Sequence, residues 1–158
     1  MLGLEPYQIQ YAAALAQLRM TPEQQAFTVW PADILAQIAG DPERRAVVIA
    51  ESGAAVGLFV LSVGAHRDKY LTQPDPDAVA LSALSIDLAA QGRGIGTRAM
   101  LTLPGFMRQH YPQAKRLVLV VNQRNGPARR LYDRSGFIVV AEREGPIGRQ
   151  WVMALALG

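Results

Sequence analysis

Residues 85–97 read Ser-Ile-Asp-Leu-Ala-Ala-Gln-Gly-Arg-Gly-Ile-Gly-Thr, a strand-like run that leads into alternate glycines at Gly92, Gly94 and Gly96. Glycine has no Cβ, so such a turn can be tight and its backbone N–H groups can approach a ligand closely. If a helix follows, its first N–H groups lack partners within the helix and its dipole favours negative charge. The stretch therefore predicts a strand–turn–helix unit suited to phosphate groups, with a plain tight connection as the alternative.

Two other nucleotide-binding motifs do not fit this turn. A P-loop ends in Gly-Lys-Ser/Thr, whereas Gly96 is followed directly by Thr97. A dinucleotide fingerprint needs one more residue before its third glycine and an acidic residue at the end of the next strand. The next strand-like run ends at Val121-Asn122. The turn therefore belongs to neither class.

The segments after the turn alternate between helical and strand patterns. Residues 95–110 have apolar side chains at helical spacing, and Pro104 should kink or break that helix because an interior proline costs about 3 kcal/mol. Residues 117–121 form a continuous apolar run, as in a strand buried on both faces. A helix over 127–134 should end at Gly136, and residues 137–141 and 150–155 should form a final antiparallel pair.

The segments before the turn predict helices and then a hairpin. Residues 7–18 have helical apolar spacing, and Thr21 to Gln24 carry a capping-box signature. A short helix should run from Pro31 to Gly40, followed by strands at 46–50 and 56–61, a loop over 66–77, and a strand over 79–88. This order predicts a mixed α/β sheet in one domain over residues 1–158.

Composition limits the possible chemistry. The chain has 158 residues, of which 50% are hydrophobic and 18% charged, as in a globular domain. It has no cysteine, and its two histidines, His66 and His110, lie far apart, so we expect no disulfide, thiolate nucleophile or metal site. No apolar run approaches the roughly 20 residues of a membrane span, and the N-terminus lacks a signal-peptide pattern. We therefore expect a cytoplasmic protein with no membrane partner.

Charge is divided unevenly along the chain. Residues 1–90 hold five Lys/Arg against ten Asp/Glu, whereas residues 91–158 hold eleven against three. A basic half predicts an anionic partner, either a phosphorylated cofactor or nucleic acid, although a general bias towards arginine would produce the same count. Nucleic acid is disfavoured because aromatic residues are not interleaved with the arginines, as stacking on bases requires.

A second motif distinguishes among these possibilities. Residues 125–137 read Asn-Gly-Pro-Ala-Arg-Arg-Leu-Tyr-Asp-Arg-Ser-Gly-Phe, and with this segment the chain resembles the GNAT superfamily of N-acetyltransferases. Residues 91–96 resemble the family's Gln/Arg-x-x-Gly-x-Gly/Ala pyrophosphate turn. The second segment matches its later Asn-x-x-Ala-x-x-Leu-Tyr-x-x-x-Gly-Phe pattern at Asn125, Ala128, Leu131, Tyr132, Gly136 and Phe137. The motifs occur in the family's order, and the resemblance is firm from about residue 79 to residue 140.

The resemblance implies a fold and a cofactor site. The mostly antiparallel sheet should splay between the strands that end near Leu88 and Val121, with acetyl-CoA as cosubstrate in the gap. Its pyrophosphate should lie on the N–H groups of residues 92–97, and its pantetheine arm should pair with backbone near Ile86 and Leu88. An N–H near Leu88 should polarise the thioester carbonyl. The cofactor-binding residues implied in this way are Ile86, Leu88, Gln91, Gly92, Arg93, Gly94, Ile95, Gly96, Thr97, Asn125 and Arg129.

The resemblance also implies direct attack of a primary amine on the thioester. Tyr132 would be the general acid that protonates the departing CoA thiolate, with a purely packed tyrosine as the alternative. At 100° per residue, Asn125, Arg129 and Tyr132 share one narrow arc of their helix, although Asn125 would equally serve as a plain N-cap. No general base is identified, and the orientation of Asp87 stays open.

Several arginines and the N-terminal half complete the hypothesis. Arg93 and Arg129, together with Arg98, Arg124 and Arg130, could meet the CoA phosphates, with a solvated cationic face as the alternative. The acidic N-terminal half and the segment 27–30 favour a small cationic amine such as a polyamine as the acceptor. The other functional hypothesis is a CoA-binding sensor or partner module without transfer activity. The final strands offer an edge for a homodimer.

Overall fold

The computed structural model describes all residues, 1–158, and is built on a seven-stranded sheet with the order β1-β2-β3-β4-β5-β7-β6. The strands are β1 (Leu2–Pro6), β2 (Arg44–Glu51), β3 (Ala54–Ser62), β4 (Ala78–Ile86), β5 (Arg116–Asn122), β6 (Ile138–Gly145) and β7 (Gly148–Ala156). The α-helices are α1 (Ala12–Ala16), α2 (Pro22–Gln25), α3 (Pro31–Ile38), α4 (Gly64–Asp68), α5 (Ile95–His110) and α6 (Gly126–Arg134), and short 3-10 turns cover Ile9–Tyr11 and Leu88–Ala90.

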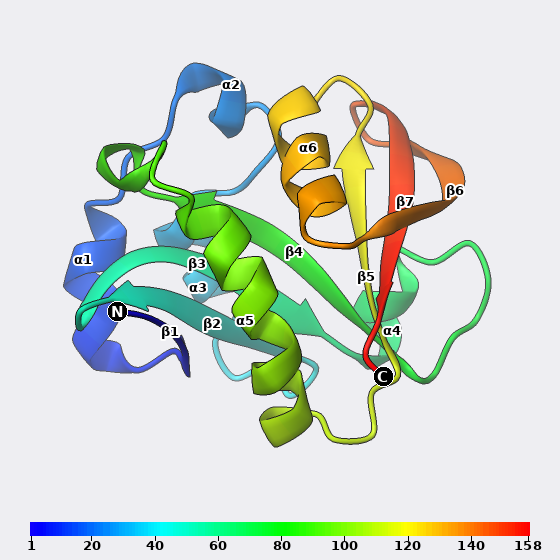
Figure 1. Cartoon of the computed structure of the whole chain (residues 1–158), viewed down its shortest axis with the longest axis horizontal. Coiled ribbons are helices and arrows are strands. Elements are labelled where there is room, and N and C mark those ends of the chain that lie inside the picture. Colours follow the sequence, from blue (N-terminus) through cyan, green and yellow to red (C-terminus); the bar gives the residue numbers. More distant parts are fainter.

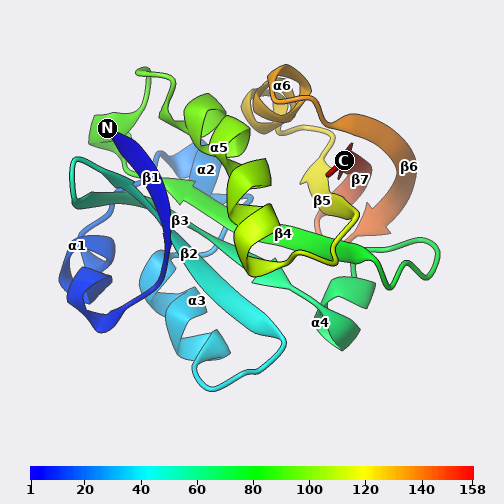
Figure 2. The same ribbon diagram turned by 60° about the horizontal axis from the view of Figure 1, so that its bottom comes forward.

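Helices cover both faces of the sheet. The long helix α5 and the helix α6 lie on one face, and α1 and α3 lie on the other (Figures 1 and 2). The larger apolar cluster fills the α5 face and includes Phe59, Met100, Leu119 and Met153, all fully buried. A second cluster between the sheet and the α1–α3 layer is centred on residues such as Leu58. The expected mixed α/β architecture is therefore confirmed.

The sheet splays between β4 and β5, as expected. These two strands form the parallel pair, and only Ala78 to Ala80 are in register with Arg116 to Val118. Beyond that point the strands diverge, so they lie close at their starts and far apart at their ends (Figure 1). The other neighbouring strands pair antiparallel. The ends of β4 and β5 consequently keep unpaired edges that face each other.

A β-bulge interrupts β4 within this diverging part. The register with β3 shifts between Leu58 and Val60, and Ala83 adopts a positive φ of 56°. A bulge bends its strand and increases the local twist. The sequence gives no signal for it because alanine has no preference for this conformation.

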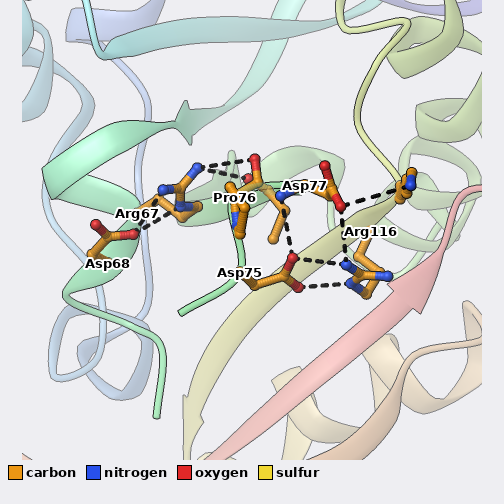
Figure 3. Close-up of polar contacts among 8 residues, drawn as sticks. Arg67, Asp68, Asp75, Pro76, Asp77 and Arg116 are labelled. Carbon is orange, nitrogen blue, oxygen red and sulfur yellow. Dashed lines mark hydrogen bonds and ion pairs between the residues drawn. The ribbon is translucent and has the colours of Figure 1, made fainter. Parts of the chain in front are cut away.

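A cluster of charged side chains ties the closed end of the splay together (Figure 3). The carboxylate of Asp75, in the loop before β4, accepts two hydrogen bonds of 2.7 Å from the guanidinium of Arg116, the first residue of β5. Arg67 of α4 donates to the carbonyl oxygens of Pro76 and Ala78. The start of β4 is thereby bonded both to β5 and to α4. We call the Asp75–Arg116 pair the clamp.

Three local expectations are corrected. The strand β1, which pairs with Val47 to Glu51, was not expected because it is short and its alternating pattern is limited to Leu2 and Leu4. The segment 66–77, expected as a loop, begins inside the short helix α4. Pro104 does not break α5, which runs continuously through it. Apolar side chains on both sides of the proline, such as Met100 and Leu103, are fully buried against the sheet, and this packing outweighs the lost backbone bond.

Two expectations for the N-terminal segments are confirmed in type, one of them with a change in length. The helix predicted over 7–18 is a 3-10 turn followed by the short α1. The capping box is present, since Thr21 Oγ1 accepts from the Gln24 N–H at 3.2 Å and Gln24 Oε1 accepts from the Thr21 N–H at 2.9 Å.

None of the helices has the length and apolar character that crossing a bilayer requires. The structure gathers no group of three or more His, Asp or Glu side chains suited to a metal ion.

We predict that Asp75→Asn lowers the melting temperature at pH 7. The hydrogen bonds from Arg116 hold the pKa of Asp75 below its usual value, and a lowered folded-state pKa means that the stabilisation is present above the unfolded pKa of about 4. The stabilisation is lost as pH falls through the folded-state pKa. The difference in melting temperature between wild type and variant should therefore narrow below about pH 4.

Thermal unfolding followed by circular dichroism between pH 7 and pH 3 measures this effect. Asp68→Asn is the control, because Asp68 pairs with Arg67 through a largely exposed side chain and should contribute little. A difference between Asp75→Asn and wild type that does not change with pH would contradict the prediction.

Candidate functional site

The glycine turn forms an array of unpartnered backbone donors. Gly92 and Gly94 adopt positive φ values of 80° and 73°, and Gly94 is the N-cap of α5. The first helical bond runs from the Arg98 N–H to the Gly94 oxygen at 3.0 Å. The N–H groups from Gly92 through Thr97 donate to no protein acceptor. At the start of a 16-residue helix, this array is suited to bind an anion.

Gly96 allows the start of α5 to pack closely against the sheet and α6. A Cβ at this position would lie 3.1 Å from Ile86 Cδ1 and 3.3 Å from both Leu131 methyl groups. Such contacts are tighter than side chains normally make, so a Cβ here would have to displace these methyl groups by a few tenths of an ångström, whereas glycine permits the close approach directly. The two sequence motifs, at 91–96 and 125–137, therefore meet at one place beside β4.

Gln91 ties the turn to its surroundings through its side chain. Its Nε2 donates to the carbonyl oxygen of Ile86 at 3.0 Å and to Gln24 Oε1 at 2.9 Å. Gln24 belongs to the capping box of α2. The carboxamide of Gln91 thus fixes the turn relative to β4 and α2. Its place at the site is that of a positioning residue.

Glu51, at the end of β2, is a residue that the sequence analysis did not identify. Its Oε1 lies 3.0 Å from Arg93 Nη2 and its Oε2 lies 3.2 Å from Arg98 Nη2. The carboxylate therefore holds one arginine of the turn and one from the first turns of α5. Nothing near Glu51 in the sequence indicates this contact, because its partners lie more than 40 residues away.

The end of β4 presents backbone groups to the gap. The Asp87 N–H donates to the Val56 oxygen of β3 at 2.8 Å. Peptide groups of successive residues in a strand point to opposite sides, so the N–H of Ile86 points away from β3 and towards the gap. The hydrogen bond that the Ile86 carbonyl accepts from Gln91 agrees with this direction.

The role expected for Leu88 is corrected. Its N–H donates to the Arg19 oxygen at 2.9 Å, so it is not available to a thioester carbonyl in this structure. Asp87 belongs to the same contact, because its Oδ1 accepts from the Arg19 N–H at 2.9 Å. This residue therefore anchors the loop after α1, and its carboxylate is not placed as a general base. The backbone donor left at this edge is that of Ile86.

Tyr132 lies on α6 in the large apolar cluster. Its side chain is buried, and its ring packs edge-on against Phe137 at a centroid distance of 5.6 Å. Burial raises the pKa of the phenol well above its usual value. Its hydroxyl makes no hydrogen bond with another residue. The hydroxyl is thus protonated and unpartnered.

Asn125 and Arg129 are engaged elsewhere than at the turn. Asn125 Oδ1 accepts from the Ala128 N–H at 3.4 Å, so the residue is the N-cap of α6. The guanidinium of Arg129 bonds to Asp133 at 3.0 Å and lies over the Trp151 ring at 5.2 Å. These are their contacts within the protein, and the binding of the cofactor by Asn125 and Arg129 stays a prediction.

The segment Phe27 to Trp30 lies on the opposite face of the sheet. Thr28 Oγ1 donates to the Leu84 oxygen at 3.3 Å, and Ser85 Oγ donates to the Val29 oxygen at 3.4 Å. The Ile86 side chain faces α5 and α6, so Ser85 must face the α1–α3 layer. The segment thus crosses beside the β4 bulge on the face away from the glycine turn.

Arg124, which follows β5, meets this segment from the other side of the gap. Its guanidinium lies over the Phe27 ring at 6.0 Å and donates from Nη2 to the Ile147 oxygen at 2.8 Å. Arg124 therefore lies beside Phe27 and the turn between β6 and β7, and its expected contact with the CoA phosphates stays a prediction. Contacts from β4 through Phe27 to Arg124 therefore span the open end of the splay.

Comparisons with known proteins agree with this geometry. The model of the "Acetyltransferase (GNAT) family" matches residues 12–137. The chain is 31% identical over 153 residues to the "Uncharacterized N-acetyltransferase YbbJ" of Bacillus subtilis (strain 168), covering 96% of this chain and 95% of that protein.

Solved structures share the fold. The aminoglycoside acetyltransferase AAC(6')-Ib in complex with coenzyme A matches with a TM-score of 0.76 at 16% identity, over 99% of this chain and 95% of that one. A chimeric spermidine N-acetyltransferase, SpeG, from Vibrio cholerae matches with a TM-score of 0.70 at 15% identity, over 99% and 95%.

The family match covers most of the chain and includes both motifs that meet beside β4, and the curated relative matches over nearly the full length of both proteins. The chain belongs to the GNAT acetyltransferase family and is an acyltransferase of the N-acetyltransferase type.

Proposed function

We propose that the chain binds acetyl-CoA across the gap between β4 and β5 and transfers the acetyl group to a primary amine. The observation that carries this proposal is the run of unpartnered N–H groups from Gly92 through Thr97 at the start of α5. The pyrophosphate is the anion of acetyl-CoA that suits a helix N-terminus. Arg93 and Arg98, held beside the turn by Glu51, add positive charge at the same place.

The rest of the cosubstrate would follow the open edge of β4. An extended amide-bearing arm can pair with a strand edge in the way that a further strand does. The Ile86 N–H points into the gap and is the donor at this position, in place of that of Leu88. It would either pair with the arm or polarise the thioester carbonyl, and a donor of the second kind contributes on the order of 3 kcal/mol to catalysis.

The reaction needs one bond formed and one broken. The amine nitrogen bonds to the thioester carbon, the carbon–sulfur bond breaks, and the thiolate takes a proton. Tyr132 is the proton donor in this proposal, because its buried phenol is protonated and its hydroxyl has no competing partner. The attacking nitrogen, which carries an extra proton after the attack, loses it to solvent. Tyr132 then takes up a proton from solvent and is restored.

Two observations favour a polyamine as the acceptor, and one observation from the structure weakens the first of them. The acidic N-terminal half predicted a small cationic amine such as a polyamine, and one neighbour in fold is named a spermidine N-acetyltransferase. In the structure, however, five of the ten carboxylates of that half form ion pairs, namely Asp41, Glu51, Asp68, Asp75 and Asp77. Paired carboxylates attract a distant cation weakly, so the polyamine acceptor stays a prediction.

We predict that Gly94→Ala weakens acetyl-CoA binding about tenfold to a hundredfold, measured by calorimetry. A Cβ at Gly94 meets no protein atom within 4 Å, so it would project into the space in front of the N–H array and keep phosphate oxygens away. Losing one hydrogen bond to a charged group accounts for a change of this size.

Gly40→Ala is the matched control for this variant. Gly40 has a φ of 75°, close to that of Gly94, and its added Cβ also meets nothing within 4 Å. Both substitutions force a left-handed alanine and should cost roughly 1 kcal/mol of stability each. Equal loss of binding in both variants, or no binding by folded wild type, would remove the basis of the cofactor site.

We also predict that Tyr132→Phe lowers kcat about a hundredfold or more, as loss of a general acid does, without changing the KM for acetyl-CoA. Stability should change little, because the hydroxyl makes no hydrogen bond. Since burial raises the pKa of Tyr132, wild-type kcat should not decline up to about pH 10 through ionisation of this residue.

Release of free thiol measures the reaction directly, because the chain contains no cysteine. Tyr111→Phe is the control, since Tyr111 is also partly buried but lies at the far end of α5. A fall in kcat below threefold in Tyr132→Phe would contradict the general-acid role. Acetyl-CoA binding without turnover of any amine would favour the alternative of a CoA-binding module.

A further inference from the structure

We infer that the acceptor carries a carboxylate as well as its amine, and that Arg124 binds this carboxylate and so determines acceptor specificity. The inference rests on the proposed function, because it assigns the acceptor to the sheet face opposite the glycine turn. It starts from the position of one guanidinium that no other part of the mechanism uses.

Arg124 is held in place by three separate segments. Its Nε lies 3.4 Å from Asn122 Oδ1, its Nη2 donates to the Ile147 oxygen at 2.8 Å, and its Cζ lies over the Phe27 ring, 6.0 Å from the centroid. Asn122 is buried, and its own amide donates to the same Ile147 oxygen at 3.2 Å. A guanidinium has five N–H donors, so these contacts orient the group and leave donors for a ligand.

The charge of Arg124 is not neutralised by the protein. Arg93, Arg98, Arg116 and Arg129 each form an ion pair with a carboxylate, whereas Arg124 forms none. A planar, oriented guanidinium without a counter-ion is suited to bidentate binding of a carboxylate. The same charge would repel a cationic acceptor at this position.

The position of Arg124 matches the place where an acceptor must enter. Val121 packs into the apolar cluster under α5 and α6, so Asn122 faces the opposite side of β5. That side also holds Phe27 and Trp30, and the Trp30 side chain is 39% exposed. A thioester that reaches through the gap from the turn would meet an acceptor here. The guanidinium of Arg124 and the aromatic surface of Phe27 and Trp30 together suit an amine that has an apolar body and a carboxylate.

The test compares amines that differ only in the carboxylate. Thiol release is measured with wild type, Arg124→Gln and Arg124→Lys on phenylalanine against phenylalaninamide, on 6-aminohexanoate against its amide, and on spermidine. We expect wild type to favour the carboxylate of at least one pair. Arg124→Gln should lower kcat/KM for that acceptor about tenfold to a hundredfold while changing its amide less than threefold. Arg124→Lys should recover only part of the loss, because lysine lacks the planar fork.

Arg108→Gln is the matched control, since Arg108 carries the same charge on an exposed position in the last turns of α5 and forms no ion pair. It should leave every rate unchanged, and the KM for acetyl-CoA should be the same in all variants. Wild type that prefers the amides or spermidine, or an Arg124→Gln variant that loses both members of a pair equally, would overturn the inference and leave the proposed function intact.

Binding supplies a second readout if no amine in the panel is acetylated. Calorimetry on the protein saturated with CoA should then show a carboxylate-bearing amine binding to wild type and at least tenfold more weakly to Arg124→Gln. Absence of such binding overturns the inference. Failure of wild type to bind acetyl-CoA at all would instead overturn the proposed function, and the two failures are therefore distinguishable.

Discussion

The parallel pairing of β4 with β5 is limited to the residues from Ala78 to Ala80, and the rest of the site depends on where it stops. A continuous ladder would saturate the backbone groups of both strands and leave no edge for a ligand. The clamp between Asp75 and Arg116 fixes the strands at their starts, so that their divergence is confined to the other end. There the sheet keeps its core on both faces while two strand edges stay unpaired. The binding geometry is thus a consequence of incomplete pairing within an otherwise ordinary sheet.

This arrangement separates the two halves of the chemistry by the thickness of one sheet. The glycine turn, Leu131 and Tyr132 lie on the face covered by α5 and α6. The segment Phe27 to Trp30 and Arg124 lie on the other face. In the proposed complex, a cosubstrate that passes between the strands would leave its pyrophosphate on the glycine turn at the first face and present only its acyl end to the second. Such placement orients the reactants and shields the thioester, which is how positioning accelerates a bimolecular step.

The sequence predicted the elements whose signals are local and missed those set by distant contacts. The glycine turn, the strands on either side of α5 and the capping box at Thr21 follow from glycine spacing, apolar runs and cap residues within a few positions. The bulge at Ala83 and the contact of Glu51 with Arg93 and Arg98 have no local signature. At Pro104 a local signal was misleading. An interior proline predicts a kinked or broken helix, but α5 continues through it because the neighbouring side chains are buried against the sheet. Among the site residues, the backbone donors of the turn and the N-cap at Asn125 could be predicted from local signals, whereas the contact of Leu88 with the distant Arg19 could not.

Of the signals in the sequence, the net charge of each half was the least informative about the chemistry of the site. The N-terminal half is acidic by count, yet half of its carboxylates form ion pairs within the protein. Asp41 pairs with Arg44 and His66, and Glu51 pairs with Arg93 and Arg98. Coulomb attraction between exposed charges fades within about 10 Å at ordinary ionic strength. A ligand therefore responds to the few charges that have no partner near its own site and not to the sum over a half-chain. Beside Phe27, the guanidinium of Arg124 has no carboxylate partner within the chain, and its sign is opposite to the net charge of the N-terminal half.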